Sequence, residues 1–124
     1  MTRSASLEDN PKLFEGLFFY LDIFTNGERA DSFFTKSVLD HGGRISERLG
    51  KHITHLVWSE GRAKTLKKAL EFEEIRIIST LWFQESLNEQ NLADEAEYKP
   101  VALAKIIDKK ITNHEDIHNL NRGL

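Results

Sequence analysis

The stretch Leu17-Phe-Phe-Tyr-Leu-Asp-Ile-Phe24 is a nearly continuous apolar and aromatic run, and Asp22 is its only charged residue. Runs of this kind are typical of strands that are covered on both faces in a parallel sheet. The covering elements of such a sheet are the helices that connect its strands, so the flanking segments should contain helices. The run therefore predicts an α/β fold.

The segments that follow alternate between helical and extended patterns. Apolar residues recur at helical spacing between Glu28 and His41, and Gly42-Gly43 supplies the left-handed stop that a helix C-terminus favours. Further helices are predicted over residues 62–72 and 80–88, and further strands over residues 44–47, 53–58 and 75–79. Because the connections are short, we expect a four-stranded parallel sheet flanked by three helices.

The two ends of the chain differ from this central part. Residues 1–12 contain few large apolar side chains, so they are predicted to form a flexible leader. Residues 13–99 form the predicted domain. After Pro100, the apolar residues Leu103, Ile106, Ile107 and Ile111 form a helical stripe among charged residues. Residues 100–124 are therefore predicted to be an additional C-terminal tail that is partly helical.

The composition limits the classes of protein to which the chain can belong. Its 124 residues are 40% hydrophobic, which is enough apolar material for one core. The formal net charge of -3 argues against the broad cationic surface of a nucleic-acid-binding protein. The absence of cysteine excludes disulfides and thiolate metal sites. Since no segment has the pattern of a signal peptide or a membrane span, we expect a soluble intracellular protein.

The aromatic side chains are expected to supply much of the core. The predicted core aromatics are Phe18, Phe19, Phe24, Phe33, Phe34 and Trp82. Trp58 is the aromatic residue with the weakest claim to burial, because it ends a strand beside a basic helix.

Four features of the chain, in this order, resemble the signature of the BRCT domain family. They are the strand from Phe18 to Phe24, the Gly42-Gly43 pair, the segment Thr54-His55-Leu56-Val57, and Trp82 followed by Ser86. The resemblance covers about residues 13–98 and implies the BRCT fold. In that fold the glycines would allow a tight turn, and Trp82 would anchor the last helix by burying a large aromatic surface.

The resemblance to BRCT domains that bind phosphopeptides is partial. Those domains hold the phosphate with a hydroxyl group and a glycine amide after the first strand, and with a Thr-x-Lys motif at the second helix. Thr65-Leu66-Lys67 resembles that motif, and Lys64 adds positive charge beside it. Asp22 stands where the hydroxyl is expected, and Ile23 where the glycine is expected. A carboxylate that faced the phosphate would repel it.

Two interpretations of these residues remain open. In the first, Thr65, Lys67 and Lys64 form a phosphate pocket that Asp22 weakens. In the second, the lysines lie on a solvated helix face, and Asp22 pairs with Lys67.

The segment His114-Glu115-Asp116-Ile117-His118 matches the His-Glu-x-x-His pattern in which two histidines on one helix face bind zinc. No acidic residue or histidine follows it to complete the coordination, so a metal site is not expected. His41, His52 and His55 are expected at a helix end, in a loop and in a strand. The sequence places no catalytic residues together, and neither an enzyme nor a cofactor is expected.

The resemblance implies a non-catalytic protein–protein interaction module that acts in the nucleus, in the DNA-damage response or in chromosome maintenance. The expected partner is a protein, either phosphorylated or carrying another BRCT domain. Two alternatives stay open: a phosphopeptide reader that uses Thr65 and Lys67, and a direct binder of nucleic-acid ends. The negative net charge disfavours the nucleic-acid alternative.

Overall fold

The computed structural model describes residues 10–107, so the predicted leader lies mostly outside the described residues, as do the end of the tail and the histidine motif. The central strand is β1 (Phe18–Thr25), which pairs in parallel with β3 (Arg44–Ile45) on one side and with β4 (His55–Ser59) on the other. β5 (Arg76–Ile78) adds to β4, again in parallel. The predicted four-stranded parallel sheet is therefore confirmed.

A fifth strand, β2 (Glu28–Arg29), was not predicted and pairs antiparallel with the end of β1. The turn between the two strands contains Asn26 and Gly27, whose φ angles are +54° and +83°. Positive φ at both central residues is the geometry of the tight hairpin turns that Asn-Gly favours. The prediction of a helix that starts at Glu28 was thus wrong at its N-terminal end, because α2 spans only Ser32–Asp40.

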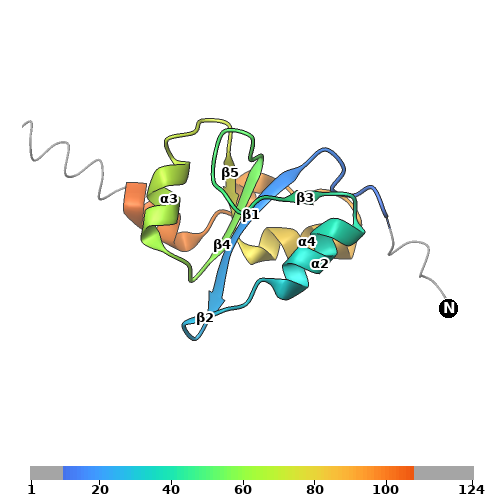
Figure 1. Ribbon diagram of the computed structural model, residues 1–124, viewed down its shortest axis with the longest axis horizontal. Coiled ribbons are helices and arrows are strands. Elements are labelled where there is room, and N and C mark those ends of the chain that lie inside the picture. Colours follow the sequence, from blue (N-terminus) through green and yellow to red (C-terminus); the bar gives the residue numbers. More distant parts are fainter. Residues whose placement is uncertain (1–9, 108–124) are drawn as a thin grey trace, which may run out of the picture.

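The helices cover both faces of the sheet (Figure 1). α2 and α4 (Thr80–Glu89) lie on one face, and α3 (Ala63–Ala69) lies on the other. Residues 101–107 are helical and lie beside α3, where Leu103 is buried in the same core cluster as Leu66 and Ala69. A short 3-10 turn, η1 (Glu95–Glu97), follows α4. None of the helices in the described part of the chain is long and apolar enough to cross a membrane.

Side chains of β1 alternate between the two faces, as the strand period requires. Phe19, Leu21 and Ile23 belong to the core cluster with α2 and α4, whereas Phe18 and Tyr20 pack against the cluster with α3. Tyr20 therefore lies on the α3 face of the sheet.

The glycine pair has two separate roles. Gly42 has a φ of +86°, and a Cβ atom there would lie 2.9 Å from the carbonyl oxygen of Pro11. A Cβ atom on Gly43 would lie 2.8 Å from the Val38 side chain. Gly42 thus permits the left-handed end of α2, and Gly43 permits close packing on that helix.

Trp82 and Ser86 connect α4 to the segment that follows it. Trp82 is fully buried, and its Nε1 donates to the carbonyl of Ala93 at 2.8 Å. The Ser86 hydroxyl oxygen accepts from the Ala93 N–H at 2.9 Å. These two bonds satisfy both backbone groups of Ala93, so the last helix and the following loop are held as one unit.

Thr54 connects β1 to the start of β4. Its hydroxyl oxygen accepts from the Phe18 N–H at 2.9 Å and donates to the Phe18 carbonyl at 3.1 Å. The side chain thus continues the backbone ladder by one step before β4 begins at His55.

Phe33 was wrongly predicted as a core residue. Its side chain is 58% exposed, while its neighbour Phe34 is buried in the cluster with α4. The buried residues of α2 are Phe34, Ser37 and Val38, which share one face of the helix, and Phe33 lies about 100° away from Phe34, outside that face. Trp58 is only partly buried, as expected for the aromatic residue with the weakest prediction of burial.

Candidate functional site

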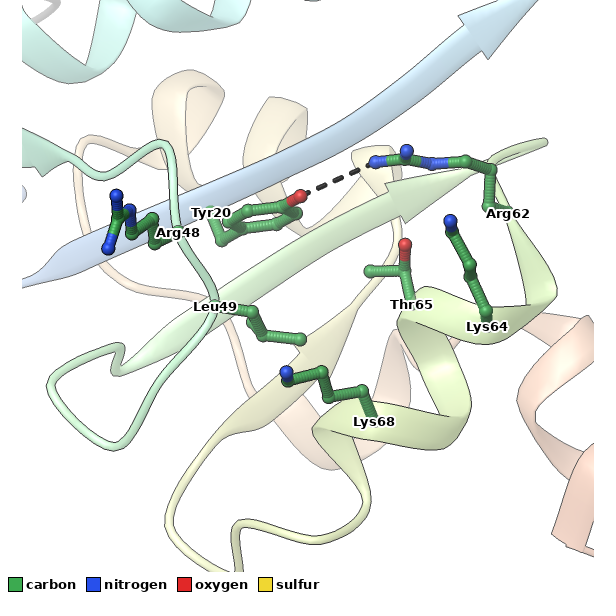
Figure 2. Close-up of a pocket in the computed structure, with 7 residues that line it drawn as sticks. All are labelled: Tyr20, Arg48, Leu49, Arg62, Lys64, Thr65 and Lys68. Carbon is green, nitrogen blue, oxygen red and sulfur yellow. Dashed lines mark hydrogen bonds between the residues drawn. The ribbon is translucent and has the colours of Figure 1, made fainter.

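A basic cavity of about 510 Å³ opens on the α3 face of the sheet, between the start of α3 and the loop that connects β3 with β4 (Figure 2). We call it the basic pocket, and its lining residues are Tyr20, Arg48, Leu49, Arg62, Lys64, Thr65 and Lys68. Four of these residues are cationic and none carries a carboxylate. Such a surface attracts anions.

The sheet and the loop determine where the lining residues lie. Tyr20 projects from β1 into the middle of the basic pocket, and Arg48 lies on the loop beside it (Figure 2). Lys64, Thr65 and Lys68 come from α3 on the opposite wall. Lys64 and Lys68 are one helical turn apart, so both ammonium groups can reach the same cavity.

Asp22 does not line the basic pocket. Its side chain is fully buried, and Oδ2 accepts from the backbone N–H of Arg62 at 2.8 Å. The guanidinium of Arg62 lies 3.4 Å from the other oxygen, Oδ1. The interpretation in which Asp22 pairs with Lys67 is therefore wrong: the cation beside Asp22 is Arg62, which immediately precedes α3.

Three further features hold Arg62 in this position. The indole Nε1 of Trp58 donates to the Arg62 carbonyl at 3.0 Å, which ties the end of β4 to the start of α3. At Gly61, a Cβ atom would lie 2.4 Å from Oδ2 of Asp22, so only glycine allows the chain to pass this close to the carboxylate. The guanidinium also lies 3.4 Å from the Tyr20 hydroxyl, a long hydrogen bond.

The sequence-predicted phosphate residues lie at different places. Thr65 and Lys64 line the basic pocket, with Thr65 largely buried. Lys67 is exposed and is not among the lining residues, whereas Lys68 is. Ile23 is buried in the core cluster with α2 and α4, so its side chain does not crowd the pocket. The phosphate-binding role of Thr65, Lys67 and Lys64 stays a prediction.

The positive charge of the basic pocket is only partly compensated. Arg62 faces the Asp22 carboxylate, but within residues 10–107 none of Arg48, Lys64 and Lys68 forms an ion pair. Three cations are thus available to a ligand. Sequence reasoning missed Arg48, which lies in a loop with no motif, and Tyr20, which was assigned to the strand alone.

His55 is the one deeply buried histidine of the described residues, and both of its ring nitrogens face a polar side chain. Its Nε2 lies 2.9 Å from a Glu95 carboxylate oxygen, and its Nδ1 lies 2.8 Å from the Thr54 hydroxyl. The ring stacks on Trp82 with the centroids 5.1 Å apart. Burial lowers the pKa of His55 below its ordinary value, although the Glu95 carboxylate acts in the opposite direction.

Acidification is therefore expected to destabilise the domain through His55. Above the ordinary histidine pKa of about 6.5, this residue is neutral in both the folded and the unfolded chain, and its contribution is constant. As the pH falls below that value, the unfolded chain takes up a proton that the folded chain resists, so the free energy of unfolding decreases. Urea melts of the unmodified protein and of His55→Gln, between about pH 8 and pH 5, measure this difference.

The variant should lose less stability than the unmodified protein over this pH range. Equal losses of stability in both proteins would contradict the assignment to His55.

Across residues 10–107, no group of three or more acidic or histidine side chains is arranged to hold a metal ion.

Comparison with protein families gives a direct match. The family model described as the twin BRCT domain matches residues 20–82, about half of the chain. The chain belongs to the BRCT domain family. The matched segment begins at Tyr20 in β1 and ends at Trp82 in α4, so it contains every lining residue of the basic pocket. A search of curated protein sequences found no significant match.

Solved BRCT structures share this fold. The C-terminal BRCT domain of human XRCC1 aligns with a TM-score of 0.61 and 15% identity, over 74% of this chain and 96% of that one. Rad4 BRCT1,2 in complex with a Crb2 phosphopeptide aligns with a TM-score of 0.60 and 21% identity, over 73% of this chain and 49% of that one. At these identities, the likeness shows the BRCT fold.

The RNA polymerase II CTD phosphatase Fcp1 also aligns, with a TM-score of 0.62 and 22% identity. The match covers 73% of this chain but only 26% of the Fcp1 chain. The chain thus corresponds to about a quarter of that enzyme.

Proposed function

We propose that this BRCT domain is a non-catalytic protein-interaction module that acts in the nucleus, in the DNA-damage response or in chromosome maintenance. We propose further that its partner carries a phosphorylated side chain, which binds in the basic pocket. The observation on which this docking site mainly rests is a cavity with four cationic side chains and no carboxylate in its lining. The position of Asp22 also supports it, because that acid is turned to Arg62 and leaves the cavity open.

A phosphate group matches the chemistry of the pocket. It carries a charge between about -1.5 and -2 at neutral pH and presents three strong acceptor oxygens. Arg48, Lys64 and Lys68 would supply charged donors, and Thr65 would supply a hydroxyl donor. An extended nucleic acid fits less well, because the net charge of -3 would repel the phosphates beyond the pocket.

Related domains and the layout of the chain give further support. The Rad4 structure contains a phosphopeptide, and XRCC1 is named as a DNA-repair protein.

We propose that the BRCT domain spans residues 13–99. Within the family, we propose that it is closest to the N-terminal BRCT domain of microcephalin, a likeness that rests on the strand from Tyr20 to Phe24 and the polar turn after it.

The phosphopeptide proposal predicts that affinity depends on one of two adjacent lysines, Lys68, and not on its neighbour, Lys67. A library of peptides of about ten residues, each with a central phosphoserine or phosphothreonine, should contain ligands that its unphosphorylated counterpart lacks. Lys68→Ala should lower the affinity of the best ligand about fivefold, or ~1 kcal/mol, which is typical of one partly exposed charge pair. Lys67→Ala is the matched control, because it removes the same charge from the same helix outside the pocket.

Fluorescence anisotropy with labelled peptides measures both effects. A fivefold loss on Lys67→Ala with no loss on Lys68→Ala would favour the family motif over the pocket. Equal binding of phosphorylated and unphosphorylated peptides would contradict the phosphopeptide proposal. Binding of 5′-phosphorylated oligonucleotides in preference to every peptide would favour the nucleic-acid alternative.

A further inference from the structure

The outer edge of β1 is open at one residue. Backbone carbonyls on this edge are satisfied at Leu17 by the Arg44 N–H (3.0 Å), at Phe19 by the Ser46 N–H (2.9 Å) and at Ile23 by the Ala30 N–H (2.9 Å). Every second residue of a strand presents its backbone groups to the same edge. Leu21 therefore presents its N–H and C=O to this edge too.

Among the described strands, none pairs with β1 beside Leu21. β3 pairs with β1 only at Phe18 and Phe19, and β2 pairs with it only at Phe24 and Thr25. Within residues 10–107, no other backbone or side-chain group bonds to the N–H or C=O of Leu21 on this side. Unpaired strand edges of this kind accept a strand from another chain.

A cavity of about 390 Å³ lies over this position, and we call it the edge notch. Its lining residues are Tyr20, Leu21, Arg29, Asp31, Thr35, Ile45, Ser46 and Glu47. The Leu21 side chain belongs to the buried core, so the part of Leu21 that reaches the notch is its backbone. The paired residues Phe19 and Ile23 lie about 13 Å apart along the strand, so the open stretch of the edge is short and centred on Leu21.

The edge notch and the basic pocket adjoin one another. Tyr20 lines both, and the connection after β3 lines the notch with Ser46 and Glu47 and the pocket with Arg48 and Leu49. A ligand that occupies one is therefore within a few residues of the other. The two cavities also differ in charge, since the charged residues of the notch are Arg29, Asp31 and Glu47, whereas every charged residue of the pocket is a cation.

We propose that the partner binds as an extended segment that pairs with the backbone of Leu21 while its phosphorylated side chain enters the basic pocket. The proposal rests on the phosphopeptide function proposed above and adds the binding mode. Pairing with the N–H and C=O of Leu21 supplies two backbone hydrogen bonds that are independent of sequence, and the phosphate supplies the selectivity. Because neighbouring side chains of a strand point to opposite faces, the paired backbone groups belong to residues at or next to the phosphorylated one.

Hydrogen exchange tests the binding mode directly. The probe is the best ligand from the phosphoserine and phosphothreonine library, bound to the full chain and followed by NMR. Upon binding, exchange of the Leu21 amide proton should slow at least tenfold, because the amide becomes hydrogen-bonded. The Asp22 amide faces the opposite edge, towards β4, and is the internal control.

A second measurement changes only the ligand, so it carries no risk of unfolding the domain. Methylation of one peptide amide nitrogen at or next to the phosphorylated residue should lower the affinity at least tenfold, because it removes a donor and blocks the strand edge. Methylation of the next amide along the peptide, which points away from Leu21, should have little effect.

The outcomes separate the two proposals. Slowed exchange at Leu21 together with one sensitive peptide amide supports strand pairing. Phosphate-dependent binding that Lys68→Ala weakens, with unchanged exchange at Leu21 and no sensitive amide, overturns strand pairing and leaves the basic pocket in place. The absence of any phosphorylated ligand overturns both proposals.

Discussion

Trp82→Ala is expected to lower the free energy of unfolding by about 3–5 kcal/mol, the cost usual for truncation of a large buried aromatic side chain. Trp82 is fully buried on the α2 and α4 face of the sheet. It stacks on His55 and on Phe14, with centroid separations of 5.1 and 6.1 Å. Removal of the indole would therefore leave a cavity between the sheet and α4, and it would also remove the donor to the Ala93 carbonyl.

Trp82→Phe separates these two contributions. Phenylalanine retains much of the apolar surface but cannot donate to the partly buried Ala93 carbonyl, so its expected cost is about 1–3 kcal/mol, the penalty for a carbonyl that loses its partner. Urea or guanidinium melts followed by circular dichroism give both values. A loss below about 1 kcal/mol for Trp82→Ala would contradict the assignment of Trp82 as a core residue.

The parallel sheet could be predicted because the sequences of β1 and β4 each have a pattern typical of a buried strand. A central strand of a parallel sheet must be apolar on both faces, and the run from Leu17 to Phe24 satisfies that requirement without reference to the rest of the chain. Helix lengths were less accurate. α3 ends at Ala69, although the apolar pattern continues to Phe72, because pattern alone does not fix where the chain turns towards β5.

Two features of the fold were missed for identifiable reasons. The Asn26-Gly27 pair is a strong hairpin signal and predicts β2, but the apolar spacing after Glu28 favoured a longer helix. Phe33 was grouped with Phe34 by hydrophobicity, but the buried face of α2 consists of Phe34, Ser37 and Val38, and Phe33 lies outside it.

The site could be predicted only in part, since its residues come from distant segments. Thr65 was identified because it belongs to a local motif, and Lys64 because it directly precedes that motif. The pairing of Asp22 with the Arg62 N–H joins residues 40 positions apart and depends on the turn through Gly61, so no local pattern reports it. Arg48 contributes through a loop whose path follows from the pairing of β3 with β1.

Asp22→Ser is expected to raise the affinity for a phosphorylated peptide at least tenfold, equivalent to about 1.4 kcal/mol. In the unmodified protein, the Asp22 carboxylate lies 3.4 Å from the Arg62 guanidinium and compensates its charge. Removal of that acid would leave the guanidinium free to bind the ligand, and the serine would supply a hydroxyl group at the position where phosphate-binding relatives are expected to have one.

Asp22→Asn is the matched control, because asparagine retains the shape and an acceptor for the Arg62 N–H but has no charge. An equal gain in both variants attributes the effect to the released guanidinium, and a gain in Asp22→Ser alone attributes it to the hydroxyl.

Ile23→Gly would place the glycine that the family pattern expects at this position. It should not be combined with Asp22→Ser, because Ile23 is a core residue and removal of its side chain would open a cavity. Because the serine variant also leaves the partly buried Arg62 N–H without its acceptor, its melting curve must be measured before affinities are compared by calorimetric titration. Unchanged affinity in both folded variants would show that the Asp22 carboxylate does not limit anion binding. The attraction of the basic pocket would then come from Arg48, Lys64 and Lys68, which form no ion pair within residues 10–107.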